Sequence, residues 1–170
     1  MKLFFASLGM LLATSSMSGL PSSGLDRLMF EGPDLHPSLT AHVIDGAPVR
    51  HVSGDVIQTN PQVSGDIDFV KAIARSGSQG KLDGNGVNAA LYARYDGEKD
   101  VGFYGLQATS MLEAERIETL LREIWAHNVS LNRAHIHRDG LTLVVVWNDG
   151  VPADVWQAVN ASVADRLTAP

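Results

Sequence analysis

The segment from Leu131 to Trp147 constrains the fold more than any other part of the chain. It holds two runs of β-compatible residues separated by Asp139-Gly140, and an Asp-Gly pair in this setting is typical of a two-residue type I′ hairpin turn. A turn centred on these two residues pairs Arg138 with Leu141 and fixes the register of the hairpin. Because side chains alternate along a strand, the odd-numbered residues 143–147 share one face, which we expect to be buried.

The same order of elements occurs twice between residues 87 and 170. Residues 88–95 and 101–108 predict a first hairpin, and apolar residues at helical spacing follow it. Ser110 with Glu113 is a capping-box pattern at the start of that helix, and Asn128 is its expected end. The inward positions of this first helix are Ala114, Ile117, Leu120, Leu121, Ile124 and Trp125. A second helix, which begins at Pro152, has the inward positions Val155, Trp156, Val159, Val163 and Leu167.

These elements predict an α+β domain over residues 87–170 with the order ββα-ββα. The simplest packing is a four-stranded, mainly antiparallel sheet with both helices on one face, because the sheet is the only large surface that can bury the two apolar stripes. The opposite face would then be covered by residues 25–75, by a partner chain or by water.

The preceding residues 20–86 predict an irregular extension that ends in a linker. Four prolines between residues 33 and 61 interrupt any long element, and residues 76–86 contain four glycines. One short helix, over residues 68–75 with Asp68 as its cap, is expected within this extension.

The first nineteen residues have the order of a secretory signal peptide. Lys2 precedes an apolar run over residues 3–13, and small residues follow that run directly. A buried N-terminal helix is the alternative. The signal predicts a periplasmic or secreted protein, with no stable membrane insertion after cleavage, because no second apolar run is long enough to span a bilayer.

Charge and cysteine content exclude several functions. The chain of 170 residues carries a net charge of -6 and no cluster of Lys and Arg, whereas a nucleic-acid partner requires a basic face. It contains no cysteine, which excludes disulfides, thiolate metal sites, a cysteine nucleophile and a lipid-modified cysteine.

The candidate site lies on the predicted open face of the second hairpin. Arg133, His135 and His137 alternate away from the buried face, and Val144 and Val146 join them from the neighbouring strand. This mixed surface predicts a non-catalytic module that binds a protein partner, a second copy of itself or a small anionic ligand, which Arg133 could hold bidentately. If this face is open, the fold should tolerate glutamate at positions 144 and 146.

A zinc-dependent hydrolase is the alternative hypothesis. His135 and His137 lie two residues apart on one strand, about 7 Å from each other, and could supply two of the three protein ligands of a catalytic zinc. No third ligand follows from local spacing, and His36, His42, His51 and His127 remain unplaced. The chain contains neither a G-x-S-x-G nor an H-E-x-x-H motif. The leading prediction is therefore the non-catalytic binding module, which needs no cofactor.

Overall fold

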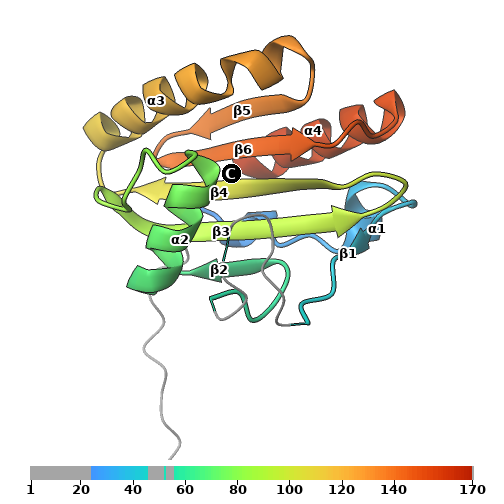
Figure 1. The fold of residues 1–170 in the computed structure, drawn as a ribbon, viewed down its shortest axis with the longest axis horizontal. Coiled ribbons are helices and arrows are strands. Elements are labelled where there is room, and N and C mark those ends of the chain that lie inside the picture. The colour runs from blue at the N-terminus through green and yellow to red at the C-terminus, as the bar shows by residue number, and fades with distance from the viewer. Residues whose placement is uncertain (1–23, 46–51, 53–55, 170) are drawn as a thin grey trace, which may run out of the picture.

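The structure is a computed structural model that describes residues 24–45, 52 and 56–169. It has the α+β class that the sequence predicts, with helices packed on a mainly antiparallel sheet (Figure 1). The elements in chain order are η1 (Asp26–Leu28), α1 (Gly32–Leu35), β1 (Thr40–Ala41), β2 (Gln62–Ser64), α2 (Ile67–Gly77), β3 (Val87–Asp96), β4 (Val101–Ala108), α3 (Met111–Ser130), β5 (Ala134–Asp139), β6 (Thr142–Asn148) and α4 (Ala153–Thr168).

The described sheet has six strands rather than the predicted four. Its order is β1-β3-β4-β6-β5, and the short strand β2 also pairs with β3. All pairs are antiparallel. The two additional strands pair with β3 along the same edge, β1 at the C-terminal end of β3 and β2 near its middle, where they satisfy backbone groups that would otherwise lie unpaired.

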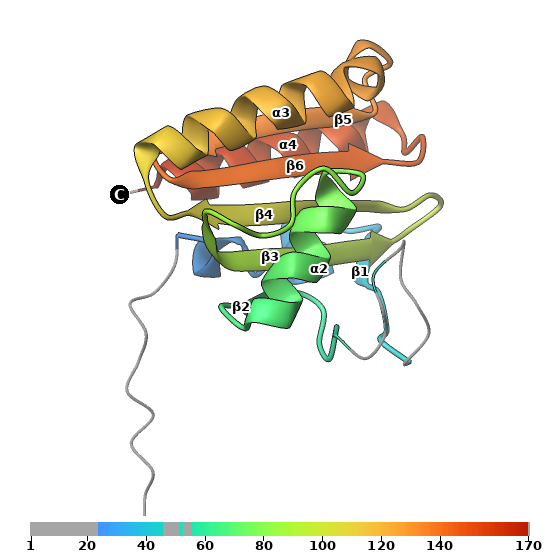
Figure 2. The same cartoon turned by 60° about the vertical axis from the view of Figure 1, so that its left-hand side comes forward.

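The prediction that both helices lie on one face of the sheet is wrong. Helices α2 and α3 cover one face, and α4 covers the other together with η1 and α1 (Figures 1 and 2). The physical reason is that β6 is apolar on both sides. Leu143, Val145 and Trp147 face α3, while Val144 and Val146 face α4, so each face requires its own covering layer.

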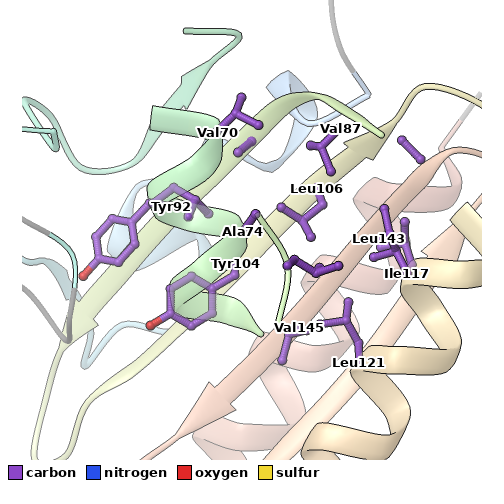
Figure 3. Close-up of a cluster of buried hydrophobic side chains, with 14 of the residues drawn as sticks. Val70, Ala74, Val87, Tyr92, Tyr104, Leu106, Ile117, Leu121, Leu143 and Val145 are labelled. Atoms are coloured by element: carbon purple, nitrogen blue, oxygen red, sulfur yellow. The ribbon is translucent and has the colours of Figure 1, made fainter. Parts of the chain in front are cut away.

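The core between the sheet and helices α2 and α3 is shown in Figure 3. Ile117 and Leu121 of α3 lie beside Leu143 and Val145 of the sheet, as the helical spacing predicts. The indole N–H of Trp125 donates a hydrogen bond of 2.7 Å to the carbonyl oxygen of Gly77. This buried bond fixes α3 to the C-terminal end of α2, a helix that the sequence placed outside the domain.

The core on the opposite face includes residues that were predicted to form the irregular extension. Phe30 packs edge-on against Phe103, with ring centroids 6.0 Å apart, and its carbonyl oxygen accepts a hydrogen bond of 3.0 Å from the Tyr95 hydroxyl. Leu25, Leu28, Leu35 and Leu39 are buried in the same core. This part of the predicted extension therefore packs into the core, although its apolar residues have no long helical or strand periodicity.

The predicted ends of the helices need small corrections. Helix α2 begins after Asp66, whose carboxylate accepts hydrogen bonds from two backbone N–H groups, and not after Asp68. Ser110 caps α3 as predicted, with a 3.2 Å hydrogen bond from the Glu113 N–H. That helix continues past Asn128 to Ser130, and the left-handed residue after it is Asn132, with φ 56°.

The second hairpin forms as predicted, but its register differs by two residues. Asp139 pairs with Thr142 and Arg138 with Leu143, so the turn residues are Gly140 and Leu141. Glycine stands first in this turn with φ 54°, which suits a type II′ turn. A two-residue change leaves every side chain on its predicted face, because the side-chain period of a strand is also two.

Candidate functional site

The predicted binding surface on β5 and β6 is only partly exposed. Val144 and Val146 are 0% exposed and belong to the core under α4, so they contribute to no open sheet face. Arg133 and His135 are exposed, and His137 is half-buried. What remains of the predicted site is a narrow strip of three side chains beside α4. Arg133 directly precedes the edge strand β5, and His135 and His137 lie on it.

The two imidazoles of this strip lie closer together than strand geometry alone suggests. Their ring centroids are 4.3 Å apart, with an angle of 32° between the ring planes. The Nε2 of His137 lies 3.2 Å from Oδ1 of Asn160 on α4, and an amide oxygen can only accept, so Nε2 carries the proton. Burial lowers the pKa of His137; the Asn160 hydrogen bond partly opposes this, and the neighbouring His135 adds to it.

Asn160→Asp is expected to raise the pKa of His137, because a carboxylate next to an imidazole favours the protonated form. In the native protein the pKa of His137 lies below its ordinary value. Its contribution to stability is therefore fully present above about pH 6.5, the unfolded value, and is lost as the pH falls below it. NMR titration of the His137 ring measures both pKa values. Gln79→Glu adds the same charge at a distant exposed position and should leave the titration unchanged; an unchanged pKa in Asn160→Asp would contradict the contact.

The described part of the chain contains no group of three or more His, Cys, Asp or Glu side chains that could hold a metal ion. His135 and His137 are therefore a pair without a third protein ligand among the described residues. A catalytic zinc site normally uses three protein ligands, so the geometry of the pair gives the zinc hypothesis little support.

A second place where polar side chains meet lies at the end of the sheet that carries the β3–β4 hairpin loop. The segment between α1 and β1, this loop and the start of α4 come together there (Figure 1). They enclose a cleft of about 240 Å³, which we call the α4 cleft. Leu39, Val151 and Val155 supply apolar surface, and the polar and charged side chains are His36, Ser38, Glu98, Lys99 and Asp154.

His36 contacts two other polar residues of the α4 cleft, Ser38 and Asp154. Its Nδ1 lies 2.8 Å from Oγ of Ser38 and accepts a hydrogen bond of 3.3 Å from the Ser38 backbone N–H. Its Nε2 lies 3.9 Å from a carboxylate oxygen of Asp154, which is beyond hydrogen-bond distance. The imidazole is thus held at Nδ1 by Ser38, and its Nε2 side faces a negative charge.

The start of α4 adds backbone donors to the same cleft. Its N-cap is Pro152, and no side chain caps the helix there. The first intrahelical bond runs from the Trp156 N–H to the Pro152 carbonyl at 3.0 Å. The three preceding N–H groups therefore have no helical acceptor, and they lie at the positive end of the helix dipole, where Pro152, Asp154 and Val155 line the cleft.

A third polar cluster, around Asp96, holds the edge of the sheet together. His42 Nδ1 lies 2.8 Å from the Asp96 carboxylate, and Arg94 forms a 2.7 Å ion pair with Asp100. The side-chain amide of Asn60 bonds to backbone groups of both His42 and Arg94. These contacts join the segment after β1 to the end of β3, and their role is structural.

Sequence reasoning missed the α4 cleft for a topological reason. His36 was left unplaced, and Ser38 lies 116 positions before Asp154 in the chain. Proline at the α4 N-cap was a visible sign of a helix start without a side-chain cap. The three segments meet only because α4 lies on the same face of the sheet as α1, and that placement was predicted wrongly.

Comparisons of the chain with protein-family models, with curated proteins and with solved structures give no significant match. None of the described helices is long and apolar enough to cross a membrane. The predicted signal peptide, residues 1–19, lies outside the described residues.

Proposed function

We propose that this protein is an exported binding module that takes a small anionic ligand, a short-chain carboxylate, into the α4 cleft. The observation that carries the proposal is the convergence of unpaired helix N–H groups, Lys99 and the His36–Ser38 pair on one hollow with an apolar wall. Ligand sites are typically concave and mostly apolar, with a few convergent polar groups. Export is proposed from the signal-like residues 1–19.

A carboxylate suits the donors of the α4 cleft. The first N–H groups of a helix bind carboxylate oxygens well, because they are free donors at the positive end of the dipole. Lys99 adds a full positive charge, and a short alkyl chain would contact Leu39, Val151 and Val155. Glu98 and Asp154 oppose an anion. Both residues are exposed, as Lys99 is, so water screens their repulsion and the attraction of Lys99 alike.

We expect butyrate to bind with a Kd of about 1 mM, which corresponds to about −4 kcal/mol. Lys99→Gln should weaken binding about three- to tenfold, because it removes a charge-assisted contact that is partly screened by solvent. Isothermal titration of the full chain measures both values. Lys81→Gln makes the same charge change at an exposed position away from the cleft and should bind like the wild type. Equal weakening by both variants would show only a general charge effect and would overturn the proposal.

The earlier hypotheses receive less support from the described residues. A ligand on the Arg133, His135 and His137 strip would contact only these three side chains. None of them lines a described pocket. Partner binding or homodimerisation was predicted through an open sheet face, but α4 covers that face. The zinc-dependent hydrolase lacks a third described ligand.

A further inference from the structure

We infer that the α4 cleft also hydrolyses short-chain carboxylic esters, with Ser38 as the nucleophile and His36 as its general base. The inference rests on the proposed function, because the carboxylate bound there would be the acid product of the reaction. It goes beyond binding because a serine hydroxyl lies 2.8 Å from an imidazole nitrogen, within the distance that proton transfer requires.

The hydrogen bonds of His36 fix the direction of this contact. A backbone N–H can only donate, and the N–H of Ser38 is directed at Nδ1 of His36. Nδ1 is therefore the unprotonated nitrogen of the neutral ring, and Nε2 carries the proton. Since Nδ1 can only accept, the hydroxyl of Ser38 must donate its proton to it. The serine is thus already oriented for deprotonation, as the nucleophile of an acyl-transfer enzyme must be.

The remaining groups of the cleft have the chemistry of an acyl-transfer site. Ser38 is exposed to solvent, so its oxygen is accessible to a substrate carbonyl. The free N–H groups at the start of α4 are the donors available for a developing oxyanion. Asp154, with its carboxylate 3.9 Å from Nε2, is too far for a hydrogen bond, so the proton-transfer unit is a Ser–His pair and not a complete triad.

The reaction proceeds in two balanced steps. Ser38 Oγ attacks the ester carbonyl carbon, its proton moves to His36 Nδ1, and the tetrahedral intermediate expels the alcohol, which takes that proton from His36. Water then attacks the acyl-serine and gives a proton to His36 Nδ1. The second intermediate expels Ser38 Oγ, which recovers the proton, and the carboxylic acid leaves. No oxidant, metal or further reactant is required.

The test uses the full chain with p-nitrophenyl butyrate as substrate and a fluorophosphonate as covalent probe. We expect hydrolysis above the buffer rate and a single label, which peptide mass spectrometry places on Ser38. Ser38→Ala should remove both the label and the hydrolysis. His36→Gln should lower kcat at least about 100-fold, the usual contribution of a general base, while circular dichroism remains that of the wild type.

Ser130→Ala is the matched control. Ser130 is also exposed, but its hydroxyl donates to the backbone carbonyl of His127 and not to an imidazole, so this variant should keep full activity and labelling. Wild-type activity in Ser38→Ala, or a label on another serine, would overturn the inference. If butyrate binds but neither hydrolysis nor label is found, the inference fails and the proposed binding function stands. If Ser38-dependent hydrolysis occurs without butyrate binding, the inference holds and the proposed carboxylate ligand is wrong.

Discussion

Val146→Glu is expected to destabilise the protein by more than about 4 kcal/mol, enough to unfold a large fraction of it at room temperature. Val146 is 0% exposed and lies in the core between the sheet and α4. An ionised carboxylate there would lose its hydration without gaining a partner, which is among the few mechanisms that exceed 4 kcal/mol for a single residue. Whole domains are stable by only about 5–15 kcal/mol.

His135→Glu is the matched control for this change. His135 lies directly opposite Val146 on the neighbouring strand and points to the same side of the sheet, but it is exposed. The same glutamate should therefore change stability there by about 0.5 kcal/mol or less. Urea denaturation followed by circular dichroism measures both variants. A Val146→Glu protein that unfolds at the wild-type urea concentration would mean that α4 does not cover this face.

The second large effect is expected for Phe30→Ala, with a loss of about 3–5 kcal/mol. Phe30 is 2% exposed. Its ring contacts Phe103 and lies 4.6 Å below the guanidinium carbon of Arg166 on α4. Removing the ring leaves a cavity where residues from three parts of the chain meet, and the cost grows with the volume of that cavity.

Met29→Ala supplies the comparison for Phe30→Ala. Met29 precedes Phe30 in the chain but is 40% exposed, so its truncation should cost less than about 1 kcal/mol. Thermal unfolding of the two variants distinguishes a structural segment from an irregular extension. Equal, small effects at both positions would show that the segment around Phe30 adds nothing to the core, and the boundary at residue 87 would then be correct.

Local elements could be predicted well because their signals are local. The β3–β4 hairpin was predicted over residues 88–95 and 101–108, within one residue of the observed strands. Ser110 was predicted correctly as the cap of α3. The inward stripe of α4 from Val155 to Leu167 is buried as its spacing predicts. Each of these features depends on residues at most four positions apart, or on one short turn.

The arrangement of the layers could not be predicted from those local signals. An amphipathic helix shows that it must cover a sheet, but not which face it covers. One informative feature was present in β6, where five apolar residues, Leu143 to Trp147, follow one another. A strand with such a run is typically buried on both faces, which favours helices on opposite sides of the sheet.

The candidate site depended on that arrangement. His135 and His137 were prominent because they alternate on a strand, yet this geometry leaves them at the edge of a helix-covered face. His36 and Ser38 are two residues apart in a segment rich in proline. Their relation to Lys99 and Asp154 arises only from tertiary packing. No spacing rule joins residues from three separate segments.

The most direct measurement of the central claim is a butyrate titration of the isotope-labelled full chain, followed by the backbone amide signals in ¹H–¹⁵N NMR spectra. We predict saturable shifts confined to the amides of residues 36, 38, 39, 98, 99, 151, 154 and 155, which line the α4 cleft. Shifts centred instead on residues 133–137 of the β5 strip, with the cleft signals unmoved, would contradict it.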